Sequence, residues 1–148
     1  MKKLFVLLTA LIIALPSFAL AAGSCTWAVE RCEEYSDECQ MVTASCTCAS
    51  GAVTGSTMTG EILAKVMRYY VYEQGVVVPG AAMNETFVVT VVDEFGLTVA
   101  TNTAVATVGT NSALDLGIFN KLTGAWVVSA SSAATTGTFQ VKLKFVKP

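Results

Sequence analysis

The sequence predicts an all-β protein, an antiparallel β-sandwich or jelly-roll-like domain. Residues 138–145 alternate between polar and apolar side chains, as a strand with one wet and one dry face does. Residues 86–101 hold two apolar stretches around 93–96, where Asp suits the start of a type I turn and Gly tolerates a positive φ. Short Val- and Thr-rich stretches also recur between Gly, Asn and Ser turns. A hairpin alone cannot bury its apolar face, so the other strands must cover it.

The alternating strand defines one face of the expected sheet. Lys142 and Lys144 lie on its polar side, and its apolar side is Phe139, Val141, Leu143 and Phe145. Such a strand belongs in an antiparallel sheet with water on its outer side. The lysines also suit an edge strand, where charge discourages further pairing.

The first 22 residues predict export. Two lysines precede an apolar run over residues 4–15, which has the length of a signal-peptide core and is too short to span a membrane. The mature chain is expected to begin at Ala22 or Gly23. Two alternatives stay open, an uncleaved anchor and a lipoprotein modified at Cys25. The expected location is secreted, periplasmic or extracellular, with no stable membrane span after cleavage.

Composition limits the partners and the chemistry. Loss of two signal-peptide lysines takes the net charge from −2 to −4 (−2 − 2), and no basic patch remains to bind nucleic acid. The chain has no histidine, which excludes Ser-His-Asp and Cys-His nucleophiles, His-ligated metals and c-type haem. The turn acids Asp93 and Glu94 and the isolated Asp115 are poor candidates for catalytic carboxylates. We therefore expect no enzyme, no cofactor, and no catalytic or metal-binding residue.

The N-terminal segment, residues 23–50, is rich in cysteine. Four cysteines recur every seven residues and a fifth follows two later: Cys25, Cys32, Cys39, Cys46 and Cys48. A helix over residues 27–42 would align the first three on one face, but its neighbours would lie about 10.5 Å apart, beyond the ~7 Å that a disulfide spans. A helical segment would therefore pair with Cys46 or Cys48, fold back near residues 36–37, or bond to another chain.

The odd number of cysteines leaves the fate of the fifth sulfur open. One alternative is two local disulfides with one buried, inert cysteine, and another is a disulfide between subunits. A Cys₄ metal site is disfavoured, because six-residue gaps are poor for zinc and an oxidising compartment favours disulfides. The sequence alone does not choose the pairing.

Residues 51–148 form the expected β-sandwich domain, in which residues 61–74 suit two structures. Apolar residues at helical spacing and an i,i+4 pair, Glu61 and Lys65, favour a helix. The β-forming tyrosines of residues 69–72 favour a strand. We expect a strand, on a ground given below.

Aromatic side chains offer a candidate binding face for a glycan or another protein. Its members are Tyr69, Tyr70, Tyr72 and Trp126. The alternative is that some of these rings are core and the others cover a face of the sheet.

From about residue 54 to 146 the order of motifs resembles a group of small phage structural proteins. A Gly-Glu-Ile-Leu stretch at 60–63 leads through Pro79-Gly80 to the hairpin at 87–97 and the closing strand at 136–145. The resemblance implies a small β-sandwich in a virion or similar assembly, an extended region around Glu61, and no catalytic residue. The signal peptide and the cysteine-rich segment depart from the pattern of that group.

Two functions follow from these observations. The first is an exported, non-enzymatic structural or assembly subunit that associates with itself or with an envelope or virion protein, and that its cysteine segment staples or links. The second is a monomeric secreted module that binds a glycan or another ligand through exposed aromatics.

Overall fold

The fold is nearly all β, as the sequence predicts. The computed structural model describes residues 23–32, 39–49, 51–66, 71–80, 83, 86–104, 110–116, 124–132 and 136–147. Their elements are β1 (Ser24–Arg31), β2 (Cys39–Ala49), β3 (Ala52–Thr57), α2 (Gly60–Val66), β4 (Val71–Pro79), β5 (Phe87–Val92), β6 (Thr98–Ala104), β7 (Ser112–Leu116), β8 (Val127–Ser132) and β9 (Thr136–Val146). No helix in these ranges is long and apolar enough to cross a membrane. The predicted signal peptide, residues 1–22, lies outside the described residues.

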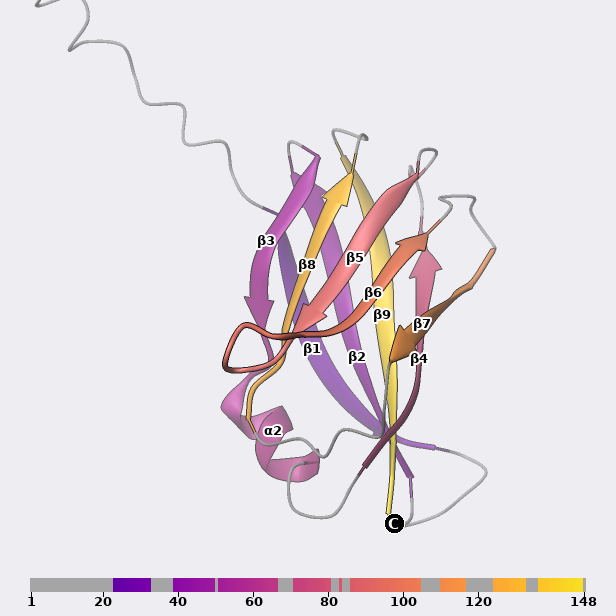
Figure 1. Cartoon of the computed structure of the whole chain (residues 1–148). Helices are drawn as coiled ribbons and strands as arrows, with labels where there is room; N and C mark the ends of the chain where they lie inside the picture. The colour runs from indigo at the N-terminus through magenta and orange to yellow at the C-terminus, as the bar shows by residue number, and fades with distance from the viewer. Residues whose placement is uncertain are drawn as a thin grey trace, which may run out of the picture.

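The strands form one antiparallel sheet that folds over into two layers and nearly closes on itself (Figure 1). One layer has the order β1-β2-β9-β4 and the other has the order β3-β8-β5-β6. On one side β7 joins the layers by pairing with both β4 and β6. On the other side the chain turns directly from β2 into β3, and an isolated bridge between Gly23 and Val53 brings the start of β1 to β3.

β9 is the central strand of the first layer. It pairs with β2 along its whole length, from Thr136 opposite Ala49 to Val146 opposite Cys39, and with β4 on its other side. The predicted alternation of buried and outward-facing side chains is confirmed. The prediction that Lys142 and Lys144 protect a sheet edge is wrong, because β9 has a neighbour on both sides.

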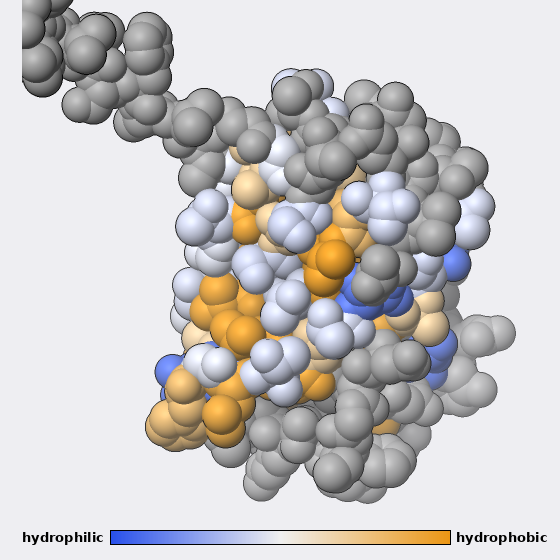
Figure 2. Space-filling view, turned by 45° about the horizontal axis from the view of Figure 1, so that its top comes forward, coloured by the Kyte–Doolittle hydropathy of each residue, from blue (hydrophilic) through white to orange (hydrophobic). Residues whose placement is uncertain are grey.

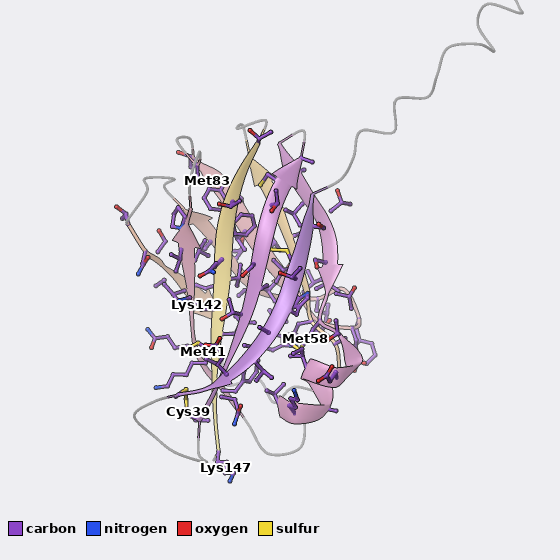
Figure 3. All side chains as sticks on the ribbon, turned by 180° about the vertical axis from the view of Figure 1, so that it is seen from behind. Cys39, Met41, Met58, Met83, Lys142 and Lys147 are labelled. Carbon is purple, nitrogen blue, oxygen red and sulfur yellow. A yellow bond between two sulfur atoms is a disulfide. The ribbon has the colours of Figure 1, made fainter. Side chains whose placement is uncertain are left out.

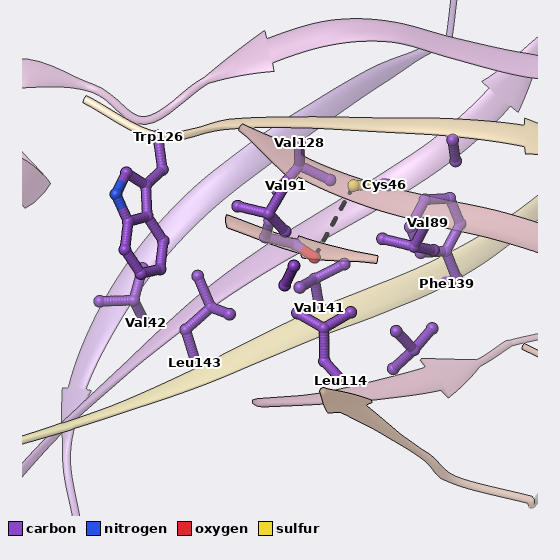
Figure 4. Packing of buried hydrophobic residues seen from close by; sticks show 14 of the residues in the cluster. Val42, Cys46, Val89, Val91, Leu114, Trp126, Val128, Phe139, Val141 and Leu143 are labelled. Atoms are coloured by element: carbon purple, nitrogen blue, oxygen red, sulfur yellow. Dashed lines mark hydrogen bonds between the residues drawn. The ribbon is translucent and has the colours of Figure 1, made fainter. Parts of the chain in front are cut away.

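Apolar side chains of both layers meet between them. Figure 4 shows Trp126 pointing toward Val42 and Leu143, and its ring centroid lies 5.7 Å from that of Phe145. The dashed line in Figure 4 joins Cys46 Sγ to a backbone oxygen 3.8 Å away. Because that sulfur is in a disulfide and carries no proton, the pair is a van der Waals contact. None of the described polar or charged residues is fully buried, so apolar packing holds the layers together.

The cysteine-rich segment is a β-hairpin rather than a helix. β1 and β2 pair residue for residue from Ser24 opposite Thr47 to Arg31 opposite Gln40. Burial along β2 alternates with a period of two, because one face packs on the core and the other faces outward. The boundary expected between residues 50 and 51 therefore falls inside one sheet, and residues 23–50 supply two strands of the first layer.

The described residues of the range 61–74, which are 61–66 and 71–74, belong to a helix and a strand respectively. In α2, Lys65 Nζ lies 3.1 Å from Glu61 Oε1, and Ile62 and Val66 are buried one turn apart. The strand β4 begins only at Val71. The expectation of one continuous strand, and the extended region around Glu61 that the resemblance implied, are therefore wrong for α2.

Candidate functional site

Four of the five cysteines pair within the β1–β2 hairpin. Cys25 and Cys46 are register partners whose Cα atoms lie 4.0 Å apart. Cys32 and Cys39, whose Cα atoms lie 5.4 Å apart, cross-link the far ends of the two strands. Disulfides persist in oxidising compartments and are rare in the cytosol, so this pairing is compatible with an exported protein.

Cys48 is the free cysteine. Its side chain is buried on the inner face of β2, and burial raises the pKa of its thiol above the ordinary value. The sulfur is therefore a protonated thiol at neutral pH, and the fold keeps it away from a second chain. Of the two alternatives for the fifth sulfur, the structure has the two local disulfides with one buried cysteine. Among the described residues no group of three or more His, Cys, Asp or Glu side chains could hold a metal ion.

Trp126 is not part of an exposed aromatic binding face, because its side chain is buried. This ring is only 2% exposed and lies in the core, where a large apolar surface is removed from water. Tyr69 and Tyr70 lie outside the described residues. The backbone of Tyr72 pairs with that of Phe145, but its side chain is outside the description.

The exposed large apolar side chains of the described chain lie together between β5 and β6. Phe95 is 75% exposed and Leu97 is 66% exposed. We call residues 93–97 the apolar turn. In Figure 2, hydrophobic side chains gather at the lower left of the view. This is the side on which α2 and the β5–β6 turn lie in Figure 1.

Hydrogen bonds hold the apolar turn in one shape. Asp93 Oδ1 accepts from the backbone N of Phe95 at 2.9 Å and of Leu97 at 2.8 Å. The backbone N of Asp93 donates to Leu97 O at 2.9 Å, and Gly96 N donates to Asp93 O at 3.1 Å. Gly96 has a φ of 78°, so the predicted reversal with Gly at the positive φ is confirmed. Asp93 thus fixes the backbone that presents Phe95 and Leu97.

Glu94, the next residue of the turn, lies against the chain that enters β8. A Cβ atom on Gly124 would overlap the carboxylate of Glu94. The absence of a side chain at Gly124, which is itself buried, therefore lets the carboxylate lie against the backbone. Hydrogen bonds to Asp93 hold the base of the apolar turn, and Glu94 lies beside Gly124.

The exposure of Leu97 is not predicted by the sequence. Simple alternation would put Leu97, Val99 and Thr101 on one face of the return strand. The β5–β6 pairing instead contains a register shift, and Val99 is buried while the other two are exposed. The sequence signal for this site is the presence of apolar residues on both sides of Gly96, where turns usually carry polar ones.

A hollow of about 380 Å³ lies on the outer face of the β1-β2-β9-β4 layer. Side chains of three adjacent strands give it hydroxyl groups and one amide: Ser24, Thr26, Ser45, Thr47, Thr138 and Gln140. Val78 and Pro79 line it at the end of β4. Figure 3 shows this layer from behind, with β1, β2 and β9 toward the viewer.

Register places the polar groups of the hollow in two rows across the sheet. One row runs from Thr26 through Ser45 to Gln140, and the next from Ser24 through Thr47 to Thr138. Gln140 Nε2 donates to Ser45 Oγ at 3.3 Å, and Thr26 Oγ1 donates to Ser45 O at 3.4 Å. The sequence does not predict this polar surface, because its side chains share a face only if residues 23–50 contain two strands.

Comparisons with protein-family models, with curated proteins and with solved structures yield no match. The resemblance to phage structural proteins therefore stays a prediction.

Proposed function

We propose that this protein is an exported, non-enzymatic structural subunit that associates with copies of itself or with an envelope or virion partner. The observation that carries the proposal is the apolar turn, which exposes Phe95 and Leu97 on a backbone held by Asp93. Burial of one such side chain contributes about 1.5–3 kcal/mol. Adjacent exposed apolar side chains in a fixed geometry are typical of interaction sites.

The cysteines support export and a non-covalent mode of association. Two disulfides within one hairpin suit an oxidising compartment. They use four of the five sulfurs, and Cys48 is buried. Subunits would therefore associate through non-covalent side-chain contacts rather than through a disulfide.

Sedimentation velocity on the oxidised chain from residue 23 tests the proposal. We expect weight-average mass to rise with protein concentration between about 0.01 and 1 mM, the range in which weak contacts form. A double variant, Phe95→Ser with Leu97→Ser, should stay monomeric, while Thr98→Ala, an exposed neighbour, should behave as the parent. A chain that is monomeric at every concentration, and that retains no partner from its native envelope, would contradict the proposal.

The outer-face hollow favours a second candidate function, a monomeric module that binds a glycan. Its volume falls in the range of about 300–1,000 Å³ that small-ligand sites occupy. Two rows of hydroxyls and an amide suit the hydroxyl groups of a sugar. Binding on a glycan array that is lost in Gln140→Ala, with the fold intact, would support this function. Retained binding in that variant would assign the sugar to another place.

A further inference from the structure

We propose that the apolar turn of one molecule docks in the outer-face hollow of a second copy, so that molecules associate head to tail. This inference rests on the proposed function and names both sides of its interface. One side of the interface is Phe95 with Leu97, and the other is the hollow, whose lining includes the partly exposed Val78.

The two surfaces lie toward opposite ends of β3 and on different layers. The apolar turn follows Val92, which pairs with Val127, and Val127 pairs with Thr57 at the far end of β3. The hollow includes Thr138 and Thr47, which are register partners beside the β2–β3 turn at the near end of β3. One molecule therefore cannot fill its own hollow, and the contact between copies uses two different surfaces. Contacts of that kind repeat into rings or open chains.

The chemistry of the hollow fits a turn better than it fits an apolar helix. Val78, which is partly exposed, offers apolar surface to the ring of Phe95. The hydroxyls of Thr47 and Thr138 offer hydrogen bonds to the exposed backbone groups that every turn carries. A mixed lining of this kind satisfies both parts of the apolar turn.

Charges of opposite sign lie beside the two surfaces. Two acids, Asp93 and Glu94, lead into Phe95. The lining of the hollow is uncharged, and Lys142 lies about 6.7 Å further along β9 from Gln140, on the same outer face. The row of Lys142 contains no acidic residue, since its register partners are Thr43 and Val76. A docked turn would place its acids near this lysine.

Photo-crosslinking identifies the receptor surface directly. Benzoylphenylalanine in place of Phe95 should crosslink to residues 78–80 or 138–140, and mixing of ¹⁵N-labelled and unlabelled chains should show that the crosslinked peptides come from two molecules. Association with crosslinks elsewhere would overturn the inference and leave the proposed function standing. Absence of self-association would overturn the inference and leave the proposed function only its envelope or virion partner.

Filling the hollow provides the matched variant. Thr47 is exposed on β2 and lines the hollow, and Thr54 is exposed on β3, away from it. Thr47→Trp should weaken self-association at least about tenfold, because its ring occupies the place of Phe95. Thr54→Trp adds the same ring and should leave association unchanged. Equal effects of the two variants, or no effect of Thr47→Trp in a chain with native circular dichroism, would overturn the inference.

Discussion

The thiol of Cys48 lies two residues after Cys46 on the inner face of β2, close in sequence to the Cys25–Cys46 disulfide. Thiol–disulfide exchange needs a thiolate, and burial raises the pKa of the Cys48 thiol. The fold thereby protects the Cys25–Cys46 bond from its nearest neighbour. The sequence alone shows five equivalent cysteines, since burial depends on the pairing of β2 with β9.

Labelling with iodoacetamide tests this state of Cys48. We expect no labelled cysteine in the folded, oxidised chain at pH 8, and one in denaturant without reductant. The folded pKa is raised, so folding is unaffected below the unfolded value of about 8.5 and is destabilised as pH rises above it. We expect the free energy of unfolding to fall less between pH 7 and pH 10 in Cys48→Ala than in the parent chain, as measured by urea unfolding at each pH. Rapid labelling of the native chain would contradict the buried thiol.

The β1–β2 hairpin carries its two disulfides at different places, and each closes a different length of chain. The Cys25–Cys46 bond spans 21 residues and the Cys32–Cys39 bond spans 7. The regular seven-residue spacing suggested a helix, although the outward-facing Ser and Thr residues of 43–47 alternate as in a strand. Among these elements, the alternation of β9 and the turn between β5 and β6 were predictable from the sequence. The strands β1 and β2 could be recognised only once the pairing of their cysteines was known.

Removal of each disulfide should reveal the difference in span. By chain entropy alone, the longer loop stabilises by about 1 kcal/mol more than the shorter one. Cys25→Ala with Cys46→Ala should therefore lower the free energy of unfolding further than Cys32→Ala with Cys39→Ala, as measured by urea titration. A larger loss from the Cys32–Cys39 pair would show that the end of the hairpin matters more than its loop length.

The two layers are joined unequally across the whole molecule. β7 has two paired positions with β6 and three with β4, and the side-chain amide of Asn102 adds a hydrogen bond to Ala113 O. β9 is paired on both sides along most of its length. Local opening free energy follows the number of buried contacts and protected hydrogen bonds, so β7 is expected to open more readily than β9.

Hydrogen exchange should resolve this difference. Amides of residues 112–116 are expected to exchange at least about tenfold faster than those of residues 139–145, which corresponds to about 1.4 kcal/mol less opening free energy. Asn102→Ala should speed exchange in β7 further and leave β9 unchanged. Uniform exchange across both strands would show that the sheet opens only as a unit.

The sequence predicts the class of the whole fold but not its closure. Local alternation identifies strands such as residues 138–145, because the period of two is set by each strand itself. The pairing of β2 with β9 joins residues about a hundred positions apart, and no local pattern specifies that choice. The apolar turn and the hollow also could not be predicted from local patterns. The apolar turn adjoins a register shift between β5 and β6, and the hollow is built from four strands that are distant in sequence.

The central place of β9 also sets the timing of folding. Of the described strands, β9 is the last that a ribosome makes, yet β2 and β4 can join one layer only through it. Until residue 146 has been synthesised, the inner faces of both strands lack their common neighbour and the layer cannot close. The β1-β2-β9-β4 layer therefore closes only after translation has reached the end of β9.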